Sequence, residues 1–429
     1  MSNTPELPVV MLAVEQSPNA AFSAVFVGQL LLAALALFGH AAVWIAALNR
    51  SHGFDLPRPL LKAFQAVFIP AVPLGAAAYL WWIASGAASW AEVPRDALVG
   101  LSDPAAISPW WAAYVFLCWA WGAWVLVQWS YRTCLRPTPA ALLSRDSRHV
   151  DVEAVLGRRP LVGRKTELLA AFPGNQILRL EVNEKRLQLR RLPAALNGMS
   201  IAHISDLHYT GKLTRDFYNV VVDQTNALGA DLIAVTGDIL DKQQCTEWLE
   251  QTLGRLRAPG GVYFVLGNHD KRLCDPDSIR EILRGAGLVD VSGRWWEARC
   301  RDVGVLLAGN EHPWFGPRPD AAQRPGSNRP TTSEDAPFSV LLTHTPDQIG
   351  WARKHGFDLV LAGHNHGGQI RPPLVGPIVS PSFHGVRYAS GLFDEPPSVM
   401  HVSRGVAGDK PIRLNCAPEI TKLVLVRPA

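Results

Sequence analysis

Short apolar runs that each end in a polar residue recur through the second half of the chain. There are five, most of them rich in Val, Ile or Leu, and they end at Asp206-Leu-His208, Gly237-Asp238, Gly267-Asn268-His269, His344 and Gly363-His364-Asn-His366. Runs of this length and composition predict buried strands. The intervening residues 214–229, 246–257, 276–286 and 347–355 have helix-compatible spacing. The pattern therefore predicts an α/β fold.

The side chains at the ends of these runs are Asp, Asn and His. Because ligands of open α/β sheets gather beyond the carboxyl ends of the strands, we expect these side chains to meet at one edge. Together they offer a mixed nitrogen and oxygen ligand set, which suits manganese, iron or zinc better than magnesium or calcium. Two such ions held close together need a shared carboxylate. The sequence thus predicts a site for two divalent metal ions.

A different pattern marks the first 131 residues, where long apolar runs contain very few charges. Three of these runs are long enough to cross a bilayer as helices, at about 21–48, 63–88 and 107–129. A signal peptide is the alternative for the first run, but Glu6 and Glu15 precede it and no Lys or Arg does. Pro70 and Pro73 in the second run are tolerated when neighbouring helices satisfy the freed backbone groups. His40 in the first run is expected to make a polar contact between helices.

The Lys and Arg residues beside these runs predict their orientation. None precedes the first run, three lie in the loop 49–62, one lies in the loop 89–106, and several follow the third run. Because positive flanks stay inside, we expect the N-terminus outside and everything after Tyr131 in the cytoplasm. The chain is therefore predicted to be a multi-pass protein of the cell membrane.

The segment 132–173 predicts a basic linker, either solvated or in contact with anionic lipid headgroups. The remaining residues, 174–429, are predicted to form a separate domain. In this domain, residues 176–192 alternate around Asn183-Glu-Lys and predict a hairpin, while 385–401 and 420–426 predict closing strands. The Pro-rich stretch 312–337 predicts a mobile surface loop.

Charge and cysteine content narrow the class of protein further. The formal charge of +4 is small for this length, and no Lys/Arg stripe crosses the strand-rich part, so binding of nucleic acid is not expected. The six cysteines include no Cys-x-x-Cys pair, which favours free thiols in a reducing compartment. No feature of the sequence indicates an obligate protein partner.

The ends of the five runs also resemble a known family. Asp206-x-His208, Gly237-Asp238-x-x-Asp241, Gly267-Asn268-His269-Asp270, His344 and Gly363-His364-Asn365-His366 are similar, in order, to the signature of the calcineurin-like metallophosphoesterases. This resemblance covers about 199–370. It implies a sandwich of two central sheets flanked by helices, an α/β/β/α arrangement, and hydrolysis of phosphoester bonds.

The resemblance also implies a role for each residue of the blocks. One metal would be held by Asp206, His208, Asp238 and His366. The second would be held by Asp238, Asn268, His344 and His364, with Asp238 bridging the two. His269, oriented by Asp241, would stabilise the transition state or protonate the leaving group.

A narrower resemblance extends past these blocks. His364-Asn-His-Gly-Gly-Gln369-Ile-Arg-Pro-Pro and Tyr388-Ala-Ser-Gly-Leu are similar to a bacterial membrane-associated branch, which includes phosphoesterases like UDP-2,3-diacylglucosamine pyrophosphohydrolase. The hypothesis is a phosphoesterase of the bacterial inner membrane whose substrate is lipid-linked, such as UDP-diacylglucosamine. Its alternatives are a broad-specificity phosphodiesterase on soluble substrates and a non-catalytic metal-binding membrane scaffold. His269 and Asp241 beside a full ligand set argue against the scaffold.

Overall fold

The computed structural model describes residues 18–90, 109–135, 137–273, 275–326 and 337–428. Contacts divide the chain into two compact units. The first contains Met1–Trp44 and Val67–Cys134, and the second contains Ile45–Ala66 and Leu135–Ala429. The connection between the first two helices therefore belongs to the same unit as the strand-rich part of the chain, which the sequence did not predict.

Three long helices account for the apolar runs of the N-terminal part. They are α1 (Pro18–Ser51), α2 (Arg58–Trp90) and α3 (Pro109–Ser130), and all three are long and apolar enough to span a membrane. The predicted helices are thus confirmed, except that residues 107–108 lie outside the described part.

A polar contact between helices surrounds His40. Its Nδ1 lies 2.6 Å from the Tyr114 hydroxyl of α3, and its Nε2 lies 2.9 Å from the Ala71 carbonyl of α2. A Cβ on neighbouring Gly39 would meet the Cys118 carbonyl, so only glycine allows this close approach of α1 and α3. The predicted interhelical role of His40 is confirmed.

Two β-sheets form the framework of the second unit. The first has the order β1 (Leu142–Asp151), β2 (Arg179–Gln188), β13 (Glu419–Val426), β3 (Ser200–Ile204), β4 (Leu232–Thr236), β5 (Val262–Val265) and β6 (Val289–Asp290). The second has the order β11 (Gly391–Glu395), β12 (Ser398–Val402), β10 (Leu359–Ala362), β9 (Ser339–Thr343), β8 (Val303–Asn310) and β7 (Trp295–Cys300). Strands β3, β4 and β5 run parallel, as do β9 and β10. All five predicted strands are confirmed.

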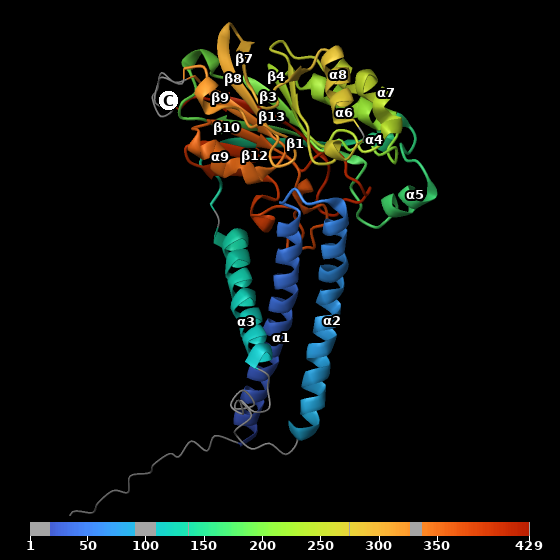
Figure 1. The fold of residues 1–429 in the computed structure, drawn as a ribbon, viewed down its shortest axis with the longest axis vertical. Helices are drawn as coiled ribbons and strands as arrows, with labels where there is room; N and C mark the ends of the chain where they lie inside the picture. The colour runs from blue at the N-terminus through green and yellow to red at the C-terminus, as the bar shows by residue number, and fades with distance from the viewer. Residues whose placement is uncertain (1–17, 91–108, 136, 274, 327–336, 429) are drawn as a thin grey trace, which may run out of the picture. The chain divides into compact units, whose positions relative to one another are not determined.

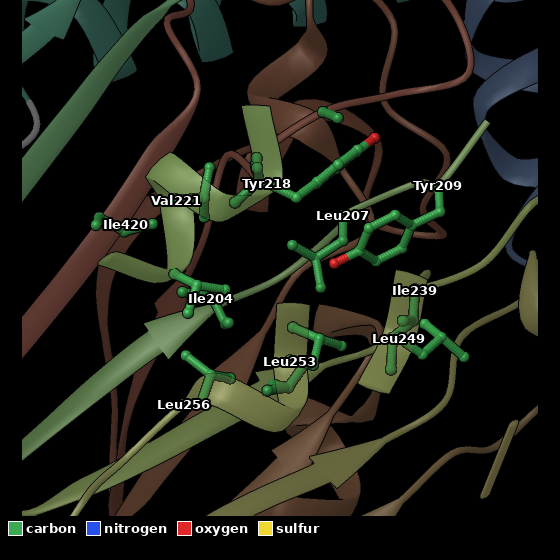
Figure 2. Close-up of a cluster of buried hydrophobic side chains, with 14 of the residues drawn as sticks. Ile204, Leu207, Tyr209, Tyr218, Val221, Ile239, Leu249, Leu253, Leu256 and Ile420 are labelled. Carbon is green, nitrogen blue, oxygen red and sulfur yellow. The ribbon is translucent and has the colours of Figure 1, made fainter. Parts of the chain in front are cut away.

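Helices cover the outer faces of this sandwich (Figure 1). The first sheet packs against α4 (Val152–Leu156), α6 (Arg215–Ala227), α7 (Thr246–Thr252) and α8 (Pro276–Gly285), and the second against α9 (Ile349–Lys354). A further short helix, α5, spans Arg164–Ala170. Figure 2 shows Tyr218 and Val221 of α6, Leu249 of α7 and Ile204 of β3 as members of one buried cluster. The predicted α/β/β/α arrangement is confirmed.

Because successive side chains of a strand point to opposite faces, one strand contributes residues to two hydrophobic cores. Ile201 faces the other sheet, whereas its neighbour Ala202 faces the helices. In β10, Leu361 faces the first sheet and Val360 faces α9. Because both faces are buried, the strands are continuously apolar, which is the pattern seen in the sequence.

Two sequence predictions near the start of this unit are wrong. Residues 179–188 form one continuous strand, β2, and not a hairpin, because β2 pairs along its length with β1 on one side and β13 on the other. Residues 142–151, predicted as linker, are the edge strand β1. Most side chains of β1 are exposed and polar, as is usual for an edge strand, and such a strand lacks the apolar pattern of a buried one.

The prediction of a mobile surface loop at 312–337 is also wrong for the first part of this stretch. Trp314 is 7% exposed, and the buried Arg324 donates to the His355 carbonyl at 2.6 Å. Residues Ala321–Gln323 form a 3₁₀ turn. Residues 327–336 lie outside the described part of the chain. Tertiary contacts of Trp314 and Arg324 therefore override a composition typical of mobile loops.

Glu419 at the start of β13 gives a test of what stabilises the first sheet. This buried carboxylate accepts from Arg404 N at 2.8 Å, from Arg404 Nε at 2.9 Å and from Asn183 Nδ2 at 3.1 Å. Burial would raise its pKa, but Arg404 and Lys185 outweigh burial and hold the pKa of Glu419 well below 4.5. A depressed folded-state pKa stabilises the fold above the unfolded-state value, and this stabilisation is lost as the pH falls.

We expect Glu419→Gln to lower the free energy of unfolding by about 3 kcal/mol at pH 7, because it removes one of the two carboxylates, Glu419 and Glu181, that pair with the largely buried Arg404. The deficit relative to wild type should shrink below about pH 4.5, where only the wild type loses charge stabilisation. Urea unfolding in detergent at pH 7 and pH 4 measures both values. A deficit of equal size at both pH values would show that the carboxylate charge is not the stabilising feature.

Candidate metal centre

The predicted site residues follow the carboxyl ends of five strands. Asp206 and His208 follow β3, Asp238 and Asp241 follow β4, Asn268 and His269 follow β5, His344 follows β9, and His364 and His366 follow β10. Five of them have left-handed backbone, with φ of 54° at Asp206, 48° at His208, 50° at Asp238, 71° at His364 and 48° at His366. Non-glycine residues in this region are strained, and such strain gathers at functional sites.

The backbone beside these residues approaches their side chains closely. A Cβ at Gly267 would lie 2.3 Å from Asp238 Oδ1, and one at Gly363 would lie 1.9 Å from Ser205 Oγ and 2.4 Å from Asp206 Oδ2. Larger residues at these positions would displace the carboxylates. Close packing against the carboxylates therefore requires glycine at both positions.

The first candidate metal group consists of Asp206, His208, Asp238 and His366. His208 Nε2 lies 3.5 Å from Asp238 Oδ2 and 3.1 Å from His366 Nε2, and His366 Nε2 lies 3.5 Å from Asp206 Oδ1. His208 Nδ1 lies 2.7 Å from Asp241 Oδ2, so Nδ1 carries the proton and Nε2 presents a lone pair. Lone pairs and carboxylate oxygens that converge at this distance favour a cation between them.

The second group consists of Asp238, His344 and His364. His344 Nδ1 lies 2.7 Å from the Thr236 carbonyl, which leaves Nε2 to face Asp238 Oδ2 at 3.2 Å and His364 Nδ1 at 3.2 Å. Among the described residues, the buried Asn268 Oδ1 and His364 Nε2 find no hydrogen-bond partner. A buried unpaired acceptor is costly, and a bound cation would remove that cost. These donors fit a divalent metal of the kind that accepts imidazole and carboxylate ligands.

Electrostatics within the site centre on Asp238, which belongs to both groups. Burial would lower the pKa of His344, but the Asp238 carboxylate outweighs burial and raises that pKa to about 9. Burial and the neighbouring His344 together hold the pKa of His364 well below its usual value. Burial also raises the pKa of the Asp206 carboxyl. The buried negative charge of Asp238 thus attracts positive charge from its surroundings.

A third cluster places Asp241 between two imidazoles. Its Oδ2 contacts His208 Nδ1 and its Oδ1 contacts His269 Nδ1. Burial would raise the pKa of Asp241, but His208 outweighs it and holds the pKa far below the usual range. His269 Nε2 lies 4.0 Å from Asp238 Oδ2 and contacts Arg272. Asp241 therefore orients His208 as well as His269, whereas the sequence suggested only the second contact.

All nine predicted side chains therefore lie together, and they line or adjoin a pocket of about 500 Å³. The pocket has walls that the sequence did not predict. Its lining outside the motif blocks includes His52, Phe54, Asp55, Leu56, Pro57, Leu61, Lys271, Arg272, Trp314, Gln369, Pro381 and Asp409. The ring centroid of Trp314 lies 5.4 Å from that of His344 and 4.9 Å from that of His364. A tryptophan directly after His312-Pro313 was the available signal, but its proline-rich surroundings obscured it.

Fold and site together define a metal-dependent hydrolase of the phosphoesterase class. Residues 199–368 match the family model described as calcineurin-like phosphoesterase. The chain therefore contains a calcineurin-like metallophosphoesterase domain, as the motif blocks predicted.

Relatives of this chain are named for different activities. The chain is 27% identical over 250 residues to YkuE, a metallophosphoesterase of Bacillus subtilis (strain 168), across 57% of this chain and 85% of that one. It is 29% identical to the phosphodiesterase YaeI of Escherichia coli (strain K12), across 53% and 82%. It is 25% identical to the UDP-2,3-diacylglucosamine pyrophosphatase LpxG of Chlamydia muridarum (strain MoPn / Nigg), across 54% and 85%.

Among solved structures, a dimetal phosphatase from Danio rerio aligns with a TM-score of 0.32 and 12% identity, over 50% of this chain and 90% of that one.

Proposed function

We propose that this protein is a membrane-anchored phosphoesterase with two metal sites, acting on a phosphoester or pyrophosphate bond in a lipid-linked substrate at the cytoplasmic face of the membrane. The observation that carries the proposal is the position of Asp238. Its Oδ2 lies 3.5 Å from His208 Nε2 and 3.2 Å from His344 Nε2, between two candidate ligand groups. One carboxylate shared by two ligand sets is the arrangement that a two-metal site requires.

Each residue of the site has a proposed part. Asp206, His208, Asp238 and His366 would hold one metal, and Asp238, Asn268, His344 and His364 the other. Two divalent cations, when bound, would supply Lewis-acid activation of the phosphoryl group and of water. Manganese, iron and zinc all suit these donors.

The remaining polar groups act on the substrate. His269 is held by Asp241 through its Nδ1 and lines the pocket, where it would donate a proton to the leaving oxygen or stabilise charge in the transition state. Arg272 and Lys271 also line the pocket and bring positive charge toward phosphate oxygens.

The lipid-linked substrate is supported by the three candidate membrane spans and by the similarity to LpxG, a UDP-2,3-diacylglucosamine pyrophosphatase. A phosphate carried by a lipid reaches a membrane-tethered enzyme at high effective concentration, whereas a soluble substrate gains nothing from the tether. UDP-diacylglucosamine is the leading candidate. The name of YaeI favours the alternative, a phosphodiesterase on soluble substrates.

Comparison of two substrates distinguishes these candidates. The full-length enzyme should hydrolyse UDP-diacylglucosamine in mixed micelles with a kcat/KM at least about 100-fold above that for a soluble diester, an advantage within the range expected for presentation at a surface. Preference for the soluble diester, with no effect of lipid or detergent, would leave only the general phosphoesterase activity.

The side of the membrane is a separate part of the proposal. The loop 49–62 and the catalytic domain belong to one compact unit, which supports a location on the same side. The Lys and Arg count in that loop favours the cytoplasmic side. A C-terminal reporter should therefore behave as cytoplasmic, and protease added to intact spheroplasts should leave the catalytic domain uncut. Alkaline phosphatase activity from a C-terminal fusion would overturn this orientation.

A further inference from the structure

The connection between α1 and α2 is joined to the catalytic domain by specific contacts. Asn49 Oδ1 accepts from the Ser380 backbone N–H at 3.0 Å, and Asn49 Nδ2 donates to the Ile378 carbonyl at 3.2 Å. Asp55 pairs with Lys271 at 2.6 Å. The connection is thus held at both of these points.

Aromatic packing strengthens the same junction. The rings of Phe54 and Phe383 meet edge to face, with centroids 4.6 Å apart. A Cβ at Gly53 would lie 3.0 Å from the Phe383 ring, so the loop backbone rests directly on that ring. From this position residues of the connection between His52 and Pro57, together with Leu61 in the first turn of α2, form one wall of the catalytic pocket.

The segment that receives these contacts is unusually apolar for a surface. Residues 372–383 contain no charged side chain. Their exposed apolar residues are Leu374, Val375, Ile378, Val379 and Phe383, and Leu374 is 90% exposed. Together with Phe54 they form what we call the apolar rim. Apolar side chains grouped on an exposed surface mark an interaction site, because water disfavours them.

Sequence position indicates what the rim meets. Asn49 lies in the last turns of the candidate span Leu30–Ser51, and the next candidate span begins at Pro59. If these spans cross a membrane, both ends of the connection would lie where a helix leaves the bilayer. Because Asn49 forms hydrogen bonds with Ile378 and Ser380, the segment 372–383 would then lie at the same depth. An uncharged, apolar segment at that depth is suited to the boundary between headgroups and acyl chains.

We infer that the apolar rim inserts into the surface of the lipid bilayer beside the pocket, so that a lipid-borne phosphoester enters the site without leaving the membrane. This inference rests on the proposed lipid-linked substrate and adds the route by which that substrate arrives. The wall formed by His52 to Leu61 would then lie against the part of the lipid nearest its phosphate.

Lipid-quenching of a fluorophore tests the insertion. An environment-sensitive label is attached at Leu374→Cys in full-length protein that also carries Cys134→Ser and Cys274→Ser, since Cys118, Cys245, Cys300 and Cys416 are buried. In vesicles whose phosphatidylcholine carries a doxyl group near the headgroup, the label at 374 should be quenched. A label at Glu250→Cys should not be, because Glu250 is an exposed charged position of α7 and does not belong to the apolar rim.

Activity tests the route. Leu374→Glu should lower kcat/KM on the lipid substrate in vesicles by about tenfold, the loss expected when one apolar side chain no longer leaves water. Activity on a soluble diester should stay within about twofold, because Leu374 does not line the pocket. The matched control is Val155→Glu, which changes an exposed apolar residue of α4 and should alter neither activity.

The outcomes separate this inference from the proposed function. Equal quenching at 374 and 250 overturns the insertion, whatever the activity on lipid. Quenching at 374 in a wild-type-like enzyme without activity on the lipid overturns the lipid-linked substrate and leaves the insertion standing. Quenching with an unchanged kcat/KM for Leu374→Glu overturns the route. An oligomer that dissociates on Leu374→Glu, without quenching by lipid, would instead identify the rim as a contact between copies of the chain.

Discussion

Asp238→Asn should remove nearly all bound metal and lower kcat at least about 10³-fold, the rate equivalent of roughly 4 kcal/mol of charge stabilisation. The reason is the position of one oxygen. Asp238 Oδ2 faces His208 Nε2 and His344 Nε2 at 3.5 Å and 3.2 Å, so one substitution removes negative charge from both candidate metal groups. Metal content of the dialysed protein and turnover of a soluble diester are the two measurements.

Asparagine is the informative replacement at this position. Asp238 has φ of 50°, a left-handed conformation that Asn tolerates and that Ala disfavours. Asn also keeps an oxygen to accept from the His269 N–H, which Asp238 Oδ1 does at 2.7 Å. The matched control is Asp223→Asn, which changes an exposed carboxylate of α6 that pairs with Arg255. Full metal content in Asp238→Asn would contradict the bridging role.

The framework of the site could be predicted because its signal is local. Each ligand-bearing strand is a short apolar run, and the residue type that follows it is set by the chemistry at the strand's end. Asp206 and His344 are 138 positions apart (344 − 206) and follow strands of different sheets, β3 and β9, yet both could be assigned to the site because each directly follows a short apolar run. The sequence pattern agrees with the structure at these positions because each ligand is adjacent in the chain to the strand that positions it.

The walls of the site could not be predicted, because they arise from contacts with no local pattern. Asn49 and Ser380 are 331 positions apart, and their hydrogen bond joins a helix end to a loop. Neither residue differs from an ordinary polar surface residue in the sequence. The edge strand β1 was missed for a related reason, since exposed polar side chains satisfy an edge strand as well as a linker.

His269→Ala should retain both metals and lose about 10²–10⁴-fold in kcat, the usual contribution of a positioned acid or base. His269 belongs to neither group that contains Asp238, and its Nδ1 is occupied by Asp241. The loss of kcat should depend on the leaving group. A diester with a poor, alkoxide-like leaving group needs protonation of the leaving oxygen and should show the larger loss of kcat. A nitrophenolate leaves without protonation, so its diester should show the smaller loss.

The contrast with Asp241→Asn sharpens this test. Asp241 contacts His208 as well as His269, so its substitution should weaken one metal group in addition to lowering turnover. Residues that hold a metal ligand by a hydrogen bond typically contribute about 10–100-fold to metal affinity. The expected result is therefore normal metal content in His269→Ala and reduced metal content in Asp241→Asn. Equal metal loss in both variants would show that His269 is a metal ligand. Proton donation matters most where the leaving oxygen is basic. An equal loss of kcat for both leaving groups would therefore show that His269 stabilises charge and does not donate a proton.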